Sequence, residues 1–170
     1  MKAIVSAYNA LLVALAVLAG ATIALAFVLI VIDVTMRATG FNPPAYTSAV
    51  VEYILLYFTL FSAPYLARKK GHVYVDAITS RLPPRARWVA NKFAYLVCVA
   101  TSLVFAVIGF KLAFEAFQSG SIEERSIDVP SWVDYSPVGP MFFILAIEFG
   151  RYLIGIDTMY ADRTKGQDSL

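Results

Sequence analysis

The stretch ARKKGHVYVDAITSRLPPRARW, Ala67–Trp88, decides the fold because it concentrates positive charge between two long apolar segments. It contains six Lys or Arg, the only His of the chain, one acidic residue and a Pro pair. Of the 170 residues, 59% are hydrophobic and 15% are charged, whereas about a quarter of the residues in a soluble domain are charged. The composition therefore predicts an integral membrane protein that forms one compact unit.

Working outward from this stretch, the chain contains four apolar segments, each near the length of about 20 residues that a helix needs to cross a bilayer. The predicted spans are residues 8–32, 49–66, 89–117 and 138–156. Breaks rich in Pro and Gly separate them, including GFNPP at Gly40–Pro44 and the Pro83–Pro84 pair. We therefore predict an all-α membrane protein in which residues 1–170 form a single domain of four transmembrane helices.

The first span also follows a Lys, as a secretory signal peptide would. Its apolar run of about 25 residues exceeds the 7–15 residues of a signal-peptide core. We therefore expect this span to be retained as a transmembrane helix.

The distribution of Lys and Arg predicts the orientation. With four spans, both termini lie on the same side as the basic stretch, and that side carries 11 of the 14 Lys and Arg. Positively charged loops stay in the cytoplasm, so both termini are predicted to be cytoplasmic. This anchoring role alone is a sufficient explanation for the basic stretch.

Residues 73–82, VYVDAITSRL, have a second feature, because an apolar face appears when they are placed on a helix. Val75, Ile78 and Leu82 share that face, and Asp76 falls in the first turn, where the helix dipole favours an acid. The pattern predicts a short amphipathic helix on the cytoplasmic membrane surface, ended by the Pro pair. A plain polar loop is the alternative.

Two pairs of opposite charges lie inside the predicted spans, near their ends. Lys111 and Glu115 are four residues apart, and Glu148 and Arg151 are three apart, so each pair shares a helix face. An ionisable residue in the hydrocarbon must face a partner or a polar cavity. We expect both pairs to be structural, and contact with a partner subunit or a transport pathway is the alternative.

A third group of charges is predicted at the opposite membrane edge from the basic stretch. Asp33 and Arg37 end the first span and Glu52 lies in the first turns of the second, so a salt bridge across this outer hairpin is expected. No acid or base falls at the middle of a span, where a proton or ion carrier needs one.

The sequence supplies little for catalysis or nucleic-acid binding. One His cannot form a bis-His haem site, and one Cys cannot exchange a dithiol. No phosphate-binding Gly loop occurs, and the net charge of +2 is too small to indicate nucleic acid. We predict neither an enzyme nor a bound cofactor or metal.

Two stretches resemble the small membrane subunit, the Q component, of tripartite ATP-independent periplasmic (TRAP) transporters. RKKGHVYVD, Arg68–Asp76, is similar to the family's basic residue, Gly-His, alternating aliphatic residues and Asp after the second span. DVTMRATGFNPPAYTSAVVEY, Asp33–Tyr53, is similar to the Val-x-x-Arg, the Pro-containing hairpin and the Glu that opens the second span. The chain departs from the family at Tyr46, where a Trp commonly precedes that Glu, and at Ala38, which is often aromatic.

The resemblance implies a role in sodium-driven uptake of an organic acid. A large membrane subunit would carry the substrate and sodium sites, a periplasmic binding protein would deliver the substrate, and this chain would be their non-catalytic scaffold. The resemblance assigns the cytoplasmic connection to Arg68, Gly71, His72, Val75 and Asp76. It assigns the periplasmic hairpin to Arg37 and Glu52.

Three other functions fit the same composition. A self-sufficient small transporter or channel acting as a homo-oligomer would move a solute when the chain is alone in liposomes. A membrane enzyme or cofactor-anchoring subunit would purify with colour or metal. An assembly or sensory protein would have no transport partner.

Overall fold

The computed structural model describes residues 2–69, 83–124 and 128–156. Four long helices dominate these ranges. Three of them are long and apolar enough to cross a membrane by themselves, and the last is so together with the residues that precede it from Ser131. They are α1 (Lys2–Ala38), α2 (Thr47–Arg68), α4 (Pro84–Ser119) and α6 (Val138–Ile154). The predicted all-α membrane fold is confirmed, whereas the surface helix predicted for 73–82 falls outside the described residues.

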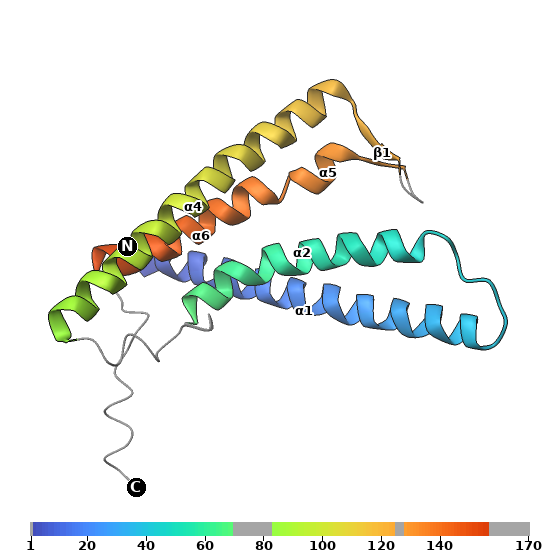
Figure 1. Cartoon of the computed structure of the whole chain (residues 1–170), viewed down its shortest axis with the longest axis horizontal. Helices are drawn as coiled ribbons and strands as arrows, with labels where there is room; N and C mark the ends of the chain where they lie inside the picture. Colours follow the sequence, from blue (N-terminus) through green and yellow to red (C-terminus); the bar gives the residue numbers. More distant parts are fainter. Residues whose placement is uncertain (1, 70–82, 125–127, 157–170) are drawn as a thin grey trace, which may run out of the picture.

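The four helices lie side by side in the order α4, α6, α2, α1 (Figure 1). α1 packs along α2 and α4 along α6, so the chain forms two helical hairpins, and α2 packs against α6 to join them. The hairpins diverge from a common end, which carries Arg68, Lys69, Arg85 and Arg151 and is called the basic edge below (Figure 1). The four helices therefore form an open fan of two hairpins.

The first helix of each hairpin is longer than a bilayer is thick. α1 has 37 residues and α4 has 36. At about 1.5 Å per residue each extends over about 55 Å, against a hydrocarbon core of about 30 Å. These helices must therefore tilt or project from the membrane, which is consistent with their divergence.

Glycines with positive φ angles end three of the helices, and at two of them the same hydrogen-bond pattern closes the helix. Gly40 after α1 and Gly155 after α6 have positive φ angles of 82° and 87°. Their N–H groups, and those of the residues that follow, donate to carbonyls of the last helical turn, as Phe41 N does to Met36 O at 2.9 Å. This is a Schellman ending, which satisfies carbonyls that would otherwise lack partners. The GFNPP break thus ends α1 through Gly40.

Buried residues at a spacing of seven mark the packed face of α1. Leu12, Ala19 and Ala26 are the buried apolar residues of the helix, while its large side chains such as Phe27 are exposed. A seven-residue repeat keeps one stripe facing a partner helix with slight supercoiling. In lipid, small residues on this stripe allow the two backbones to approach closely.

The same repeat occurs on α4, where it includes a close backbone contact with α6. Tyr95, Ser102, Gly109 and Ala116 are buried at intervals of seven residues. A Cβ atom added to Gly109 would lie 2.6 Å from the backbone N of Gly139 on α6. Only a residue without a side chain fits between α4 and α6 at this point.

Residues 119–137, which separate the last two predicted spans, contain structure of their own. β1 (Ile122–Glu124) pairs antiparallel with β2 (Asp128–Pro130), and the short helix α5 (Ser131–Tyr135) leads into α6. The Tyr57 hydroxyl on α2 donates to the Val133 carbonyl at 2.8 Å. This bond links the two hairpins away from the basic edge.

Candidate functional site at the basic edge

A fully buried carboxylate lies where the two hairpins meet. Glu148 on α6 is 0% exposed. Its Oε1 accepts a hydrogen bond from Arg68 Nη1 of α2 at 2.9 Å, and its Oε2 accepts one from Arg151 Nη1 at 3.1 Å. We call these three residues the Glu148 cluster. Both carboxylate oxygens face guanidinium groups, so the protein itself supplies the positive charge that a buried carboxylate requires.

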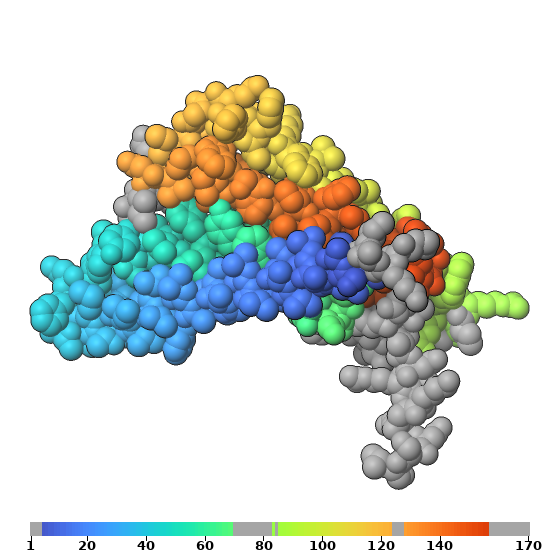
Figure 2. Space-filling view, turned by 180° about the vertical axis from the view of Figure 1, so that it is seen from behind, coloured from blue at the N-terminus to red at the C-terminus, as the bar shows by residue number. Residues whose placement is uncertain are grey.

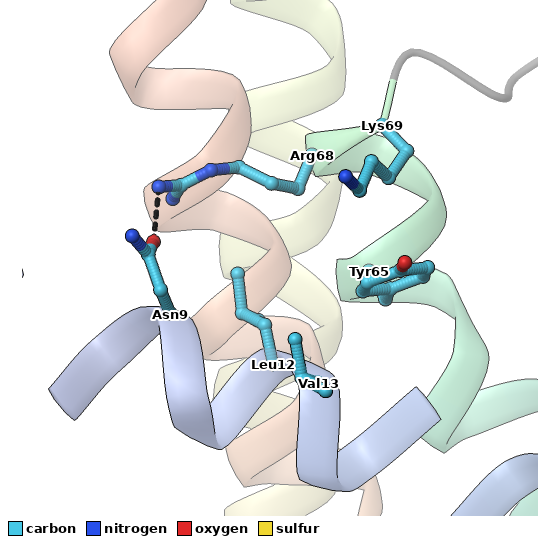
Figure 3. A pocket seen from close by; sticks show the side chains of 6 residues that line it. All are labelled: Asn9, Leu12, Val13, Tyr65, Arg68 and Lys69. Carbon is cyan, nitrogen blue, oxygen red and sulfur yellow. Dashed lines mark hydrogen bonds between the residues drawn. The ribbon is translucent and has the colours of Figure 1, made fainter. Parts of the chain in front are cut away.

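The first helix joins this cluster through its N-terminal turns. Arg68 also donates to Asn9 Oδ1, as Figure 3 shows, and its guanidinium carbon lies 5.6 Å from the centre of the Tyr8 ring. In the space-filling view the start of α1 lies beside α6 (Figure 2). Arg68 therefore connects α1, α2 and α6 in one polar network at the basic edge.

Two further side chains satisfy the last carbonyl groups of neighbouring helices. The buried Tyr152 hydroxyl donates to the Ala67 carbonyl at the end of α2, at 2.8 Å. Lys92 of α4 donates to the Tyr152 and Leu153 carbonyls at the end of α6. A Lys at this place also complements the negative end of the helix dipole. Each helix ending at the basic edge is thus bonded to a residue of another helix.

Through these contacts the Glu148 cluster links α1, α2 and α6 at the basic edge. Removing one partner of a buried ion pair leaves the other charge uncompensated, which is energetically costly. An ion pair between two helices therefore resists their separation. Within the described ranges, no group of three or more His, Cys, Asp and Glu side chains could hold a metal ion.

The predicted pair of Glu148 and Arg151 is present, and the structure adds Arg68 to it. The family resemblance assigns Arg68 to the connection after the second span, and no local pattern in the sequence links it to Glu148. Sequence reasoning also missed Asn9 and Tyr152 as contributors to the site. The available signal was topology, because the N-terminus, the end of the second span and the end of the fourth are all predicted at one membrane edge.

The predicted pair of Lys111 and Glu115 is also present, in a different environment. Lys111 Nζ lies 3.6 Å from Glu115 Oε1, and the two side chains are 71% and 56% exposed. This is a pair along one helix near the far end of α4. The two pairs that looked equivalent in the sequence therefore differ completely in burial.

The remaining predicted positions lie apart from this site. Arg37 pairs with Asp33 on its own helix at 2.8 Å, so this ion pair runs along α1. Glu52 is exposed in the second turn of α2. Four positions of the predicted cytoplasmic connection lie outside the described residues: Gly71, His72, Val75 and Asp76.

Four membrane-length helices, two of them linked by a buried ion cluster at one edge, define a multi-pass α-helical membrane protein. A family model described as tripartite ATP-independent periplasmic transporters, DctQ component, matches residues 26–155. The chain belongs to this family, and it is a small membrane subunit of a TRAP transporter in the inner membrane. Comparison with curated proteins gave no match. The resemblance found in Arg68–Asp76 and Asp33–Tyr53 is confirmed by the family match.

Proposed function

We propose that this subunit is a non-catalytic scaffold for the large membrane subunit in sodium-driven uptake of an organic acid. In this role a periplasmic binding protein delivers the acid, and the large subunit binds and moves it. The chain contributes a rigid surface, and the substrate and ion sites lie in its partner.

The observation that carries the proposal is the separation of polar and apolar groups in the described helices. The buried charged side chains, Glu148 and Asp134, lie near opposite ends of the last hairpin rather than at its middle, and both carboxylate oxygens of Glu148 have cationic partners. In contrast, α1 and α4 present large exposed side chains along their lengths, such as Phe27 and Val107. The outer surface of α1 is open over most of its length in Figure 2. A subunit arranged this way offers surface to a partner or to lipid.

The length and divergence of the hairpins support the same role. α1 and α4 exceed the hydrocarbon thickness, so the fan must tilt in the bilayer. A partner packed against such helices would be held at a fixed height and angle. Because lipid supplies little hydrophobic drive between helices, this association would depend on close van der Waals packing.

The function is tested by co-expressing the tagged chain with its large subunit and measuring both co-purification and uptake. Proteoliposomes with the large subunit, this chain and the binding protein should take up members of a panel of labelled carboxylic acids when sodium is higher outside. Omitting this chain should abolish uptake, and the chain alone should move nothing. Uptake by the chain alone would instead establish a self-sufficient small transporter.

The predicted orientation has its own test by cysteine labelling. In a Cys98→Ala background, Asn42→Cys introduces a thiol in the exposed turn between α1 and α2, and Arg85→Cys introduces one at the basic edge. With both termini cytoplasmic, a membrane-impermeant maleimide added to spheroplasts should label residue 42 and leave residue 85 unlabelled. Residue 85 should react only after the membrane is permeabilised. The reverse pattern would show that the basic edge faces the periplasm.

A further inference from the structure

A small pocket of about 250 Å³ opens beside the Glu148 cluster, between the start of α1 and the end of α2. Figure 3 shows its lining, in which Arg68 and Lys69 reach over the space from α2 and two apolar side chains rise from α1. The lining residues are Asn9, Leu12, Val13, Tyr65, Arg68 and Lys69. The pocket therefore combines two cations with an apolar wall.

The polar and apolar parts of the pocket lie at different depths in the membrane. Lys69 directly follows the last residue of α2, at the membrane edge, and Tyr65 lies one turn further into the span. On α1, Asn9 lies nearest the basic edge, and Leu12 and Val13 follow towards the middle of the helix. A molecule filling the pocket would meet charge at the edge and hydrocarbon beneath it.

Within residues 2–69, 83–124 and 128–156, Glu148 is the acid that pairs with a cation of the pocket. Glu148 is shared by Arg68 and Arg151, so it compensates one of the two guanidinium groups. The bonds to Glu148 and Asn9 use two of the five N–H groups of Arg68. Lys69 is exposed, and its Nζ lies 5.9 Å from the centre of the Tyr65 ring, over the pocket rather than away from it (Figure 3).

We propose that this pocket binds an anionic phospholipid of the leaflet at the basic edge. Lys69 and Arg68 contact the phosphate, and Leu12 and Val13 line the path of the first acyl carbons. Lys and Arg at a membrane surface attract anionic lipids, and an apolar wall below them selects a lipid over a soluble anion. The proposal rests on membrane insertion and is independent of the transport function.

The test measures lipid retention by the full chain in detergent, by native mass spectrometry. The probes are phosphatidylglycerol and phosphatidylcholine with the same acyl chains. Lys69→Gln removes a charge from the pocket, and Val13→Trp fills the apolar wall while keeping the charges. Arg85→Gln is the matched control, because it removes an exposed charge from the same edge outside the pocket.

The wild-type chain should retain phosphatidylglycerol in preference to phosphatidylcholine. Lys69→Gln should weaken phosphatidylglycerol binding about five-fold, Val13→Trp should reduce it, and Arg85→Gln should leave it unchanged. Equal retention of the two lipids, or equal losses in Lys69→Gln and Arg85→Gln, would show only diffuse surface attraction. Displacement by excess inorganic phosphate with no effect of Val13→Trp would identify a free-anion site and overturn the lipid assignment.

Discussion

Replacing Glu148 with Gln should lower the free energy of unfolding by about 3 kcal/mol. The substitution keeps the shape of the side chain and removes the charge shared by Arg68 and Arg151. Removing one partner of a buried ion pair costs about 3–5 kcal/mol. The lower part of this range applies because the two Arg side chains are 21% and 27% exposed, so solvent compensates part of the loss. Unfolding of the purified chain in mixed micelles of mild detergent and dodecyl sulfate measures the change.

Glu115→Gln is the matched control for this experiment. It removes a Glu that also pairs with a cation on its own helix, but from an exposed position. Its cost should stay within about 0.5 kcal/mol, as for other exposed pairs. Equal costs for the two variants would show that the Glu148 cluster does not hold the hairpins together.

A double-mutant cycle distinguishes the interaction between Arg68 and Glu148 from a general effect of burial. Arg68→Gln together with Glu148→Gln should cost less than the sum of the two single variants, with a coupling of about 1–3 kcal/mol. In the transport complex, loss of the ion pair between Arg68 and Glu148 should also reduce co-purification of the large subunit, because the angle between the two hairpins would no longer be fixed. Additive costs would place the two residues in independent interactions.

Replacing Gly109 with Leu should separate α4 from α6 and cost about 3 kcal/mol or more. The first added carbon alone would lie 2.6 Å from the backbone N of Gly139 and 2.8 Å from a methyl carbon of Val138. A backbone atom cannot rotate away as a long side chain can, so the helices themselves must move. Gly109→Ala should already cost about 1–3 kcal/mol by the same contact. The same micelle unfolding assay, together with the yield of folded protein, measures both variants.

Gly20→Leu and Gly150→Ala are controls in helices of the same kind. A Cβ atom at either position would meet nothing within 4 Å. Gly20→Leu should therefore be tolerated, and Gly150→Ala should be neutral or slightly stabilising because Ala favours the helix. If Gly109→Leu were as stable as Gly20→Leu, close packing at Gly109 and Gly139 would not determine the α4–α6 hairpin.

Several features of this protein follow from local sequence. The predicted spans 8–32, 49–66 and 89–117 lie within α1, α2 and α4, because a long apolar run in lipid must form a helix to satisfy its backbone. The predicted end of α1 at GFNPP is the observed Schellman turn, since a Gly at the right place permits a positive φ angle. The family also follows from short motifs on either side of the second span.

The sequence does not identify the helix faces that pack against other helices. In a soluble helix the apolar stripe identifies the buried face, but here apolar residues occur all around α1 and α4. Lipid is as apolar as a protein interior, so hydrophobicity does not separate the face that contacts another helix. Residue size does not identify this face either, because Leu12 is buried whereas Ala14 of the same helix is exposed.

The sequence by itself determined a membrane protein of four helices, the breaks between them and a basic stretch suited to one membrane side. Only the tertiary structure decided that Arg68 pairs with Glu148 80 residues away, and that Gly109 approaches Gly139. It also decided that α5 lies within hydrogen-bonding distance of Tyr57. The physical reason is that helix formation and helix ends depend on neighbours in sequence. Pairing across helices depends on their rotation and crossing angle, which are set by all the packed residues together.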